Sequence, residues 1–220
     1  MKLYMPTKVY NEKNCVENHS RELAALGTKA LIVTGKHSSR INGSLEDVKG
    51  ALERERIPYV IFDEIEENPS VETVMKARAL GVSEGADFVI GVGGGSPMDA
   101  SKAISLMMAN PEHDERLLYT KVQTSADGTG SEVTPYAILT KNVLPDIVLT
   151  TVPLEKDREA FAHLEKRTKQ SISHHIFPAL ALVDVTYLQT ASRTGCINTA
   201  VDTLAHLIES HLNTNSTEYS

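Results

Sequence analysis

The stretch that most constrains the fold is Asp87–Lys102, which reads DFVIGVGGGSPMDASK. Its first part, Phe88–Val92, has the length and the β-branched content of a buried strand. Gly93–Gly95 follow, and Ser96 is then predicted to be the N-cap of a helix with Pro97 at its first position. Glycines allow a tight turn close to a ligand, and the first N–H groups of a helix favour an anion. The stretch therefore predicts a phosphate site, and the alternative is a tight turn that binds nothing.

Strands and helices alternate on both sides of this stretch, which predicts an α/β fold. A Rossmann-like parallel sheet with flanking helices is the expected architecture, because strands separated by helices of this length form βαβ units. Ligands of such sheets lie at the carboxyl ends of the strands. The predicted strands are Ala30–Thr34, Pro58–Asp63, Phe88–Val92 and Ala181–Asp184, with Met5–Tyr10 extended. One helix is predicted to begin at about Ser44, with that serine as its cap. Two others are predicted at Val71–Ser83 and Thr199–Leu212.

The residues after the first strand bear on the choice of nucleotide. NAD-specific folds carry an acidic residue near this strand end, which accepts hydrogen bonds from the ribose. Here the position holds Gly35, followed by Lys36, His37, Ser38, Ser39 and Arg40. A lysine and two hydroxyls in this place favour the 2′-phosphate of NADP over NAD. The alternative is that Lys36 and Arg40 are solvated loop charges.

Two further stretches contain side chains with possible chemical roles. Thr124–Thr140 is rich in hydroxyls and glycines, so it can line a pyrophosphate or a ribose, and it can equally be a surface loop. Asp202 and His206 are four residues apart in a predicted helix and project from one side of it. Such a pair can supply two ligands of a divalent metal, although the same spacing is common in surface pairs.

The composition excludes some functions. With 22 basic and 29 acidic residues the net charge is −7, which argues against a nucleic-acid partner. No run reaches the roughly 18 apolar residues of a membrane span, and the first residues lack an apolar signal segment. Two cysteines, Cys15 and Cys196, are too few for a disulfide framework, so a cytoplasmic location is expected.

GGGSPMDASK resembles the GGGSxxDxxK signature of the iron-containing (group III) alcohol dehydrogenases. Three other stretches agree with that family in the same order: MPTKVY at Met5–Tyr10, TSADGTGSEVTPYAILT at Thr124–Thr140, and AVDTLAHLIE at Ala200–Glu209. The resemblance implies NADP (or NAD) and Fe²⁺ (or Zn²⁺) as cofactors. It also implies hydride transfer between a small primary alcohol or aldehyde and the nucleotide.

The resemblance carries site residues with it. Asp202 and His206 match the aspartate and histidine that bind the catalytic metal, and two further histidines complete that site in relatives. Lys169 matches a lysine that contacts the cofactor. The residues expected to bind the cofactor are Gly35, Lys36, Ser38, Ser39, Asn68, Gly93, Gly94, Gly95, Ser96, Asp99, Thr124, Ser125, Thr129, Thr134, Tyr136 and Lys169.

The expected domains are a dinucleotide-binding domain at 1–184 and the start of an all-helical metal-binding domain at 185–220. The chain ends at Ser220, so a truncated second domain is expected, and its uncovered helix face favours a homo-oligomer such as a dimer. Residues 142–165 are expected to be an insertion in a hairpin that relatives close with a short turn. Two alternatives are a non-catalytic NADP-binding module and a relative of the glycerol dehydrogenases or dehydroquinate synthases.

Overall fold

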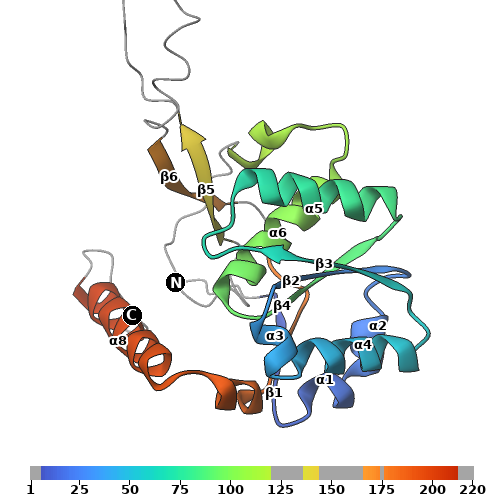
Figure 1. The fold of residues 1–220 in the computed structure, drawn as a ribbon, viewed down its shortest axis with the longest axis horizontal. Coiled ribbons are helices and arrows are strands. Elements are labelled where there is room, and N and C mark those ends of the chain that lie inside the picture. The colour runs from blue at the N-terminus through green and yellow to red at the C-terminus, as the bar shows by residue number, and fades with distance from the viewer. Residues whose placement is uncertain (1–5, 120–135, 144–165, 174–175, 213–220) are drawn as a thin grey trace, which may run out of the picture.

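The computed structural model describes residues 6–119, 136–143, 166–173 and 176–212, and the expected α/β fold is confirmed (Figure 1). Three strands form a parallel sheet in the order β3-β2-β4. Two more form a parallel pair, β1-β7, and the last two form an antiparallel hairpin, β5-β6. The strands are β1 (Lys8–Asn11), β2 (Ala30–Gly35), β3 (Tyr59–Ile65), β4 (Phe88–Val92), β5 (Tyr136–Val143), β6 (Lys166–Ser173) and β7 (Leu180–Val183).

Helices cover both faces of the three-stranded sheet. In Figure 1, α5 and α6 lie on one side of it, and the short N-terminal helices lie with α4 on the other. The helices are α1 (Cys15–Asn18), α2 (Ser20–Ala24), α3 (Ser38–Ile41), α4 (Ser44–Arg54), α5 (Val71–Ser83), α6 (Gly95–Ala109) and α8 (Arg193–Leu212), with 3₁₀ turns η1 (Glu115–Tyr119) and η3 (Val185–Thr190).

The side chains of β2 divide between two apolar cores. Leu31 and Val33 point into the core beneath α5 and α6, while Ala30 and Ile32 point into the core beneath α4. This alternation follows from the two-residue period of a strand, and all four residues are completely buried. β2 is therefore the centre of the fold, and its carboxyl end lies next to that of β4.

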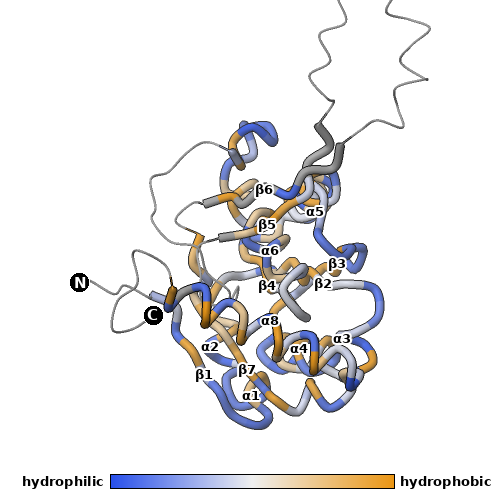
Figure 2. Tube along the Cα trace, turned by 90° about the vertical axis from the view of Figure 1, so that its left-hand side faces the viewer, coloured by the Kyte–Doolittle hydropathy of each residue, from blue (hydrophilic) through white to orange (hydrophobic). Residues whose placement is uncertain are grey.

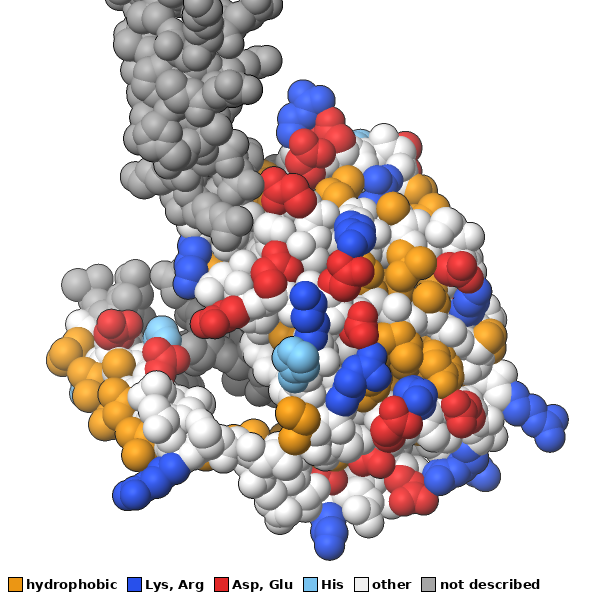
Figure 3. All heavy atoms as spheres, viewed as in Figure 1, with side chains coloured by type: hydrophobic (Ala, Val, Ile, Leu, Met, Phe, Trp, Pro, Cys, Tyr) orange, Lys and Arg blue, Asp and Glu red, His pale blue; other side chains and the backbone are white. Residues whose placement is uncertain are grey.

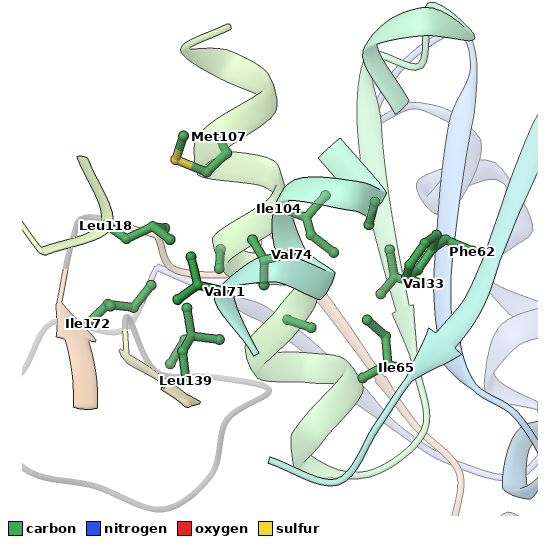
Figure 4. Packing of buried hydrophobic residues seen from close by; sticks show 14 of the residues in the cluster. Val33, Phe62, Ile65, Val71, Val74, Ile104, Met107, Leu118, Leu139 and Ile172 are labelled. Atoms are coloured by element: carbon green, nitrogen blue, oxygen red, sulfur yellow. The ribbon is translucent and has the colours of Figure 1, made fainter. Parts of the chain in front are cut away.

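The first core also holds the hairpin in place. Figure 4 shows side chains from α5, α6, η1 and the β5-β6 hairpin meeting in one cluster. The contributors include Val71, Val74, Ile104, Met107, Leu118, Leu139 and Ile172, each at most 6% exposed. Burying an aliphatic side chain of this kind contributes about 1.5–3 kcal/mol. The second core joins α4 to β4 and β7, and Figure 2 colours the segments that pass through the interior mostly orange.

Two predicted caps differ from the structure. α4 begins at Ser44 itself, with Gly43 (φ 84°) as the N-cap residue, so Ser44 is inside the helix. Its hydroxyl bonds instead to Asn42 Oδ1 at 2.8 Å. Glycine tolerates the left-handed φ of this cap at no steric cost, which explains why the helix starts there. By contrast, Ser70 caps α5 as predicted, since its side chain accepts a hydrogen bond from Thr73 N.

Asp87 closes the opposite, amino-terminal edge of the sheet. Its carboxylate accepts hydrogen bonds from the amides of Lys29 and Thr28, both at 2.9 Å, and from the Thr28 hydroxyl at 2.7 Å. These hydrogen bonds lower the pKa of the Asp87 carboxyl below its ordinary value. Asp87 thus ties the start of β2 to the start of β4.

The first strand of the hairpin continues into the first residues of the expected insertion. β5 runs to Val143 and pairs with β6 from Lys166, so Asn142 and Val143 belong to a strand. Residues 144–165, which form the remainder of the predicted insertion, lie outside the described part of the chain.

The segment between β7 and α8 is anchored to the sheet domain. Tyr187 in η3 donates a hydrogen bond from its hydroxyl to Asp47 Oδ2 of α4 at 2.7 Å. Burial, followed by the hydrogen bond to Asp47, raises the pKa of Tyr187. Asp184, at the end of β7, accepts hydrogen bonds from Thr186 N and, at 2.6 Å, from Asn14 N. The path of the chain into α8 is therefore fixed by two elements of the α/β domain.

α8 begins at Arg193, earlier than the predicted Thr199, and carries an exposed apolar row (Figure 3). The row consists of Ile197, Val201, Leu204, Leu207, Ile208 and Leu212, each between 49% and 75% exposed. No described helix is both long and apolar enough to cross a membrane.

Candidate dinucleotide-binding site

The predicted phosphate turn lies at the carboxyl end of β4. Gly93 has φ 137°, a backbone conformation that side chains other than glycine rarely adopt. A Cβ on Gly93 would also lie 3.0 Å from Pro97 Cγ. Both restrictions explain why the sequence requires glycine where the strand turns into α6.

The helix after the turn starts earlier than predicted. α6 begins at Gly95 with Gly94 as the N-cap residue, and no side chain caps it, so the prediction that Ser96 is the N-cap is wrong. Ser96 lies in the first turn, where its hydroxyl accepts a hydrogen bond from Asn68 N at 3.3 Å. The amides of Gly95 and Ser96 precede any intrahelical acceptor, as in every helix start.

The turn is open toward solvent and fits a phosphate. Gly93, Gly94 and Gly95 are all exposed. A Cβ built on Gly94 or Gly95 would meet no atom within 4 Å, so the space that side chains would occupy is free for a ligand. First-turn amides and the positive end of the helix dipole both face this region, which favours an anion.

The end of β2 provides the second part of the site. Lys36 and Ser38 are exposed next to the half-buried Gly35, as a role in binding a 2′-phosphate requires. Ser39 differs, because it is completely buried and its Oγ lies 2.7 Å from the hydroxyl of Thr34. The Thr34 hydroxyl also donates to Val92 O at 2.8 Å, which joins the carboxyl ends of β2 and β4. The expected contact between Ser39 and the cofactor is therefore corrected: its hydroxyl fixes the strand ends.

An acidic residue of the neighbouring strand is paired with a residue that follows β2. Asp63, near the end of the neighbouring strand β3, lies 2.6 Å from the guanidinium of Arg40. Both side chains are about half exposed, so the pair contributes little to stability. The pair does neutralise the negative charge of Asp63, so Arg40 is not simply a solvated loop charge.

The turn after β3 connects to the same region. Asn68 has a left-handed backbone (φ 54°). Glu66 Oε1 accepts hydrogen bonds from Ser70 N at 2.8 Å and from the Thr73 hydroxyl at 2.9 Å. Burial alone would raise the pKa of the Glu66 carboxyl, but these hydrogen bonds outweigh it and lower the pKa. The turn is thus held in one conformation at the start of α5.

Asp99 is predicted to bind the cofactor, but in the structure its carboxylate contacts β5 and Lys102. Its Oδ2 accepts a hydrogen bond from Ile138 N of β5 at 3.1 Å, and its Oδ1 lies 3.6 Å from Lys102 Nζ. Sequence reasoning missed Lys102, although its spacing of three residues from Asp99 on one helix is a signal for an ion pair.

The remaining predicted cofactor residues are only partly described. Thr124, Ser125, Thr129 and Thr134 lie outside the described residues. Tyr136 is the first residue of β5. Lys169 is exposed on β6 and pairs in register with Thr140.

The predicted metal ligands lie on α8. Asp202 Oδ1 is 3.6 Å from His206 Nε2, and Glu209 Oε2 is 3.7 Å from His206 Nδ1. All three side chains are exposed, and the described chain contains no group of three or more residues arranged to hold a metal ion. Since a protein metal site normally needs three or four ligands, these residues supply part of a site at most.

A parallel sheet with an open glycine turn at its carboxyl edge defines a Rossmann-like α/β protein. The family model "Iron-containing alcohol dehydrogenase" matches residues 6–185, so the chain belongs to the iron-containing alcohol dehydrogenase family. Members of this family use NAD(P) and iron in general.

Individual relatives agree with this assignment. The chain is 27% identical over 202 residues to the long-chain primary alcohol dehydrogenase AdhA of Thermoanaerobacter ethanolicus, covering 86% of this chain and 45% of the relative. It is 28% identical to an NADPH-dependent butanol dehydrogenase of Clostridium saccharobutylicum, covering 97% of this chain and 52% of the relative. A crystal structure of an iron-containing alcohol dehydrogenase from Thermotoga maritima superposes with a TM-score of 0.79 at 37% identity, covering 98% of this chain and 56% of that one. The chain thus spans about half the length of these relatives.

Proposed function

We propose that this chain is the dinucleotide-binding part of an NADP-dependent alcohol dehydrogenase that interconverts a primary alcohol and its aldehyde. The observation that carries the proposal is the open turn Gly93–Gly95, with uncapped amides at the start of α6. The names of relatives support the alcohol class, since one acts on long-chain primary alcohols. A cytoplasmic location is part of the proposal, and both cysteines among the described residues are free thiols, which agrees with it.

The preference for NADP rests on the end of β2. Gly35 places no acidic side chain at the strand end, Lys36 offers a charge, and Ser38 offers a hydroxyl. No described residue between Gly35 and Arg40 is acidic, and Asp63 of the next strand is paired with Arg40. Relatives do not decide the matter, because an NADH-dependent butanol dehydrogenase B of Clostridium acetobutylicum is also similar to this chain.

The chain's own residues bind and orient the nucleotide in this proposal. The turn holds the pyrophosphate through backbone amides, and Lys36 neutralises the 2′-phosphate. The nucleotide supplies the hydride acceptor or donor. A divalent metal, when bound, would polarise the alcohol oxygen. Asp202 and His206 could provide two of its ligands, and the described residues do not complete the site.

A second candidate is a nucleotide-binding module without catalysis. It is favoured by the exposed and incomplete ligand set on α8. Turnover of a primary alcohol with NADP and added Fe²⁺ distinguishes the two candidates. If the protein binds the nucleotide without turnover, and Asp202→Ala changes neither result, the non-catalytic module is supported.

Calorimetric titration with NADPH and NADH tests the proposed nucleotide. Lys36→Met should weaken NADPH binding by about fivefold, the equivalent of about 1 kcal/mol for one exposed charge-assisted contact, and should leave NADH binding unchanged. Lys29→Met is the matched control, because Lys29 precedes the same strand at its other end and pairs with Glu84. Equal effects of both substitutions, or tighter binding of NADH than of NADPH by the wild type, would contradict the preference for NADP.

A further inference from the structure

Three segments that are far apart in the sequence meet around the glycine turn. They are the first turn of α6, the turn before α5, and the strand β5. The first connection runs from Asn68 N to Ser96 Oγ at 3.3 Å. It ties Ser96, which supplies a first-turn amide, to Asn68, which has a left-handed backbone.

The second connection runs from the same turn to β5. Thr140 N donates to Pro69 O at 2.8 Å, and the Thr140 hydroxyl donates to Asn68 O at 3.0 Å. Thr140 is 9% exposed, so these bonds are largely shielded from water. Both polar groups of Thr140 therefore hold the turn that contains Asn68.

The third connection returns from β5 to α6. Asp99 Oδ2 accepts a hydrogen bond from Ile138 N at 3.1 Å, and Lys102 Nζ lies 3.6 Å from Asp99 Oδ1. The Lys102 side chain is only 4% exposed. A buried cation thus balances the carboxylate, which spares the nearby phosphate turn an uncompensated negative charge.

These connections close a ring: Ser96 to Asn68, Asn68 to Thr140, along β5 to Ile138, and through Asp99 back to α6. Ile138 and Thr140 are two residues apart, so their N–H groups point to the same edge of the strand. The β5-β6 hairpin packs on the core beneath α5 and α6 through Leu139 and Ile172. The ring is therefore attached to the packed core of the fold.

We infer that Asp99 and Thr140 are positioning residues of the dinucleotide site: they fix Ser96 and Asn68 relative to the glycine turn without contacting the nucleotide. The inference rests on the proposed function and assigns to Asp99 a different role from direct cofactor binding. Displacement of a binding group by a fraction of an ångström weakens hydrogen bonds that depend on distance and angle. Substitutions that break the ring should therefore reduce the affinity for the nucleotide, although the substituted residues do not contact it.

Thr140→Val is the principal test, because valine has nearly the same shape and suits a strand. It removes the hydroxyl bond to Asn68 O and should weaken NADPH binding by up to about fivefold, the limit set by the free energy of one neutral hydrogen bond. Thr28→Val is the matched control, since it also removes a threonine hydroxyl bond, to Asp87 at the opposite edge of the sheet. It should lower the melting temperature without changing NADPH affinity.

Asp99→Asn gives a second test, because the two interpretations of Asp99 predict opposite changes in NADPH affinity. If Asp99 acted only as a negative charge near the phosphates, its removal would tighten NADPH binding. Asp99→Asn removes the charge that pairs with Lys102 and leaves a weaker acceptor for Ile138 N. If Asp99 is a member of the ring, the substitution should therefore weaken binding and speed hydrogen exchange at the Ile138 amide, measured on the nucleotide-free protein. The exchange readout does not depend on activity or on bound nucleotide.

The outcomes distinguish a failure of the proposed function from a failure of the positioning role of Asp99 and Thr140. A wild-type protein that binds neither NADPH nor NADH contradicts the proposed function. A wild type that binds NADPH, together with equal affinities for Thr140→Val and Thr28→Val, overturns the positioning inference alone. Tighter binding by Asp99→Asn overturns it as well.

Discussion

Adding one methyl group to the glycine turn should separate folding from binding. In Gly95→Ala, the new Cβ meets no protein atom within 4 Å, and the residue occupies the first position of α6. The substitution should therefore stabilise the protein by about 0.4–1 kcal/mol, because alanine restricts the unfolded chain more than glycine does. The same methyl group would project into the space assigned to the pyrophosphate. Overfilling such a space costs about 1–3 kcal/mol, so NADPH affinity should fall by about tenfold.

Gly50→Ala is the control for this substitution. Gly50 is exposed in α4, and a Cβ there also meets nothing within 4 Å. It should stabilise the protein to a similar or greater extent, since alanine is favoured over glycine in a helix interior by about 1 kcal/mol. It should leave NADPH affinity unchanged. Urea unfolding and calorimetric titration measure the two quantities separately. Unchanged affinity in both variants would refute the assignment of the turn to the phosphates.

The structure makes three further predictions about stability. Gly91→Ala should destabilise the protein by about 1–3 kcal/mol in urea unfolding, because its Cβ would lie 2.5 Å from Ser101 Oγ, and a second substitution, Ser101→Gly, should recover part of the loss. Because the pKa of Asp87 is lowered in the folded protein, its carboxylate stabilises the fold above the ordinary aspartate pKa, and this contribution is lost as the pH falls through the lower, folded pKa. Unfolding measured between pH 7 and 3 should show this loss of stability in acid, and Asp87→Asn should reduce it. Tyr187→Phe removes the hydrogen bond to Asp47 and should increase hydrogen exchange in η3 and at the start of α8, whereas equal exchange in both proteins would contradict the anchoring role of Tyr187.

Local signals in the sequence were sufficient for the elements that local chemistry determines. Val71–Ser83 and Phe88–Val92 have the predicted bounds, the first because Ser70 caps it and the second because its apolar run ends at a glycine. The caps predicted at Ser44 and Ser96 were wrong for one common reason. In each case a glycine ahead of the serine takes the N-cap position, which glycine also favours: Gly43 directly before Ser44, and Gly94 two residues before Ser96.

Long-range contacts account for what the sequence could not predict. The pairing of β1 with β7 joins the two ends of the α/β domain, and nothing in either strand specifies its partner. Ser38 and Ser39 are equivalent in the sequence, yet only Ser39 turns inward, because Thr34 and the end of β4 lie beneath it. The roles of Asp99 and Thr140 depend on β5 meeting α6, which no local pattern reveals.

The proposed function depends on backbone amides at the start of α6 that bind the phosphates of a dinucleotide. Amide chemical shifts measured by heteronuclear NMR during titration with NADPH test this most directly. The largest changes should occur at Gly94, Gly95 and Ser96, with smaller changes at Lys36. Saturable binding that leaves these amides unshifted while residues elsewhere change would contradict the account.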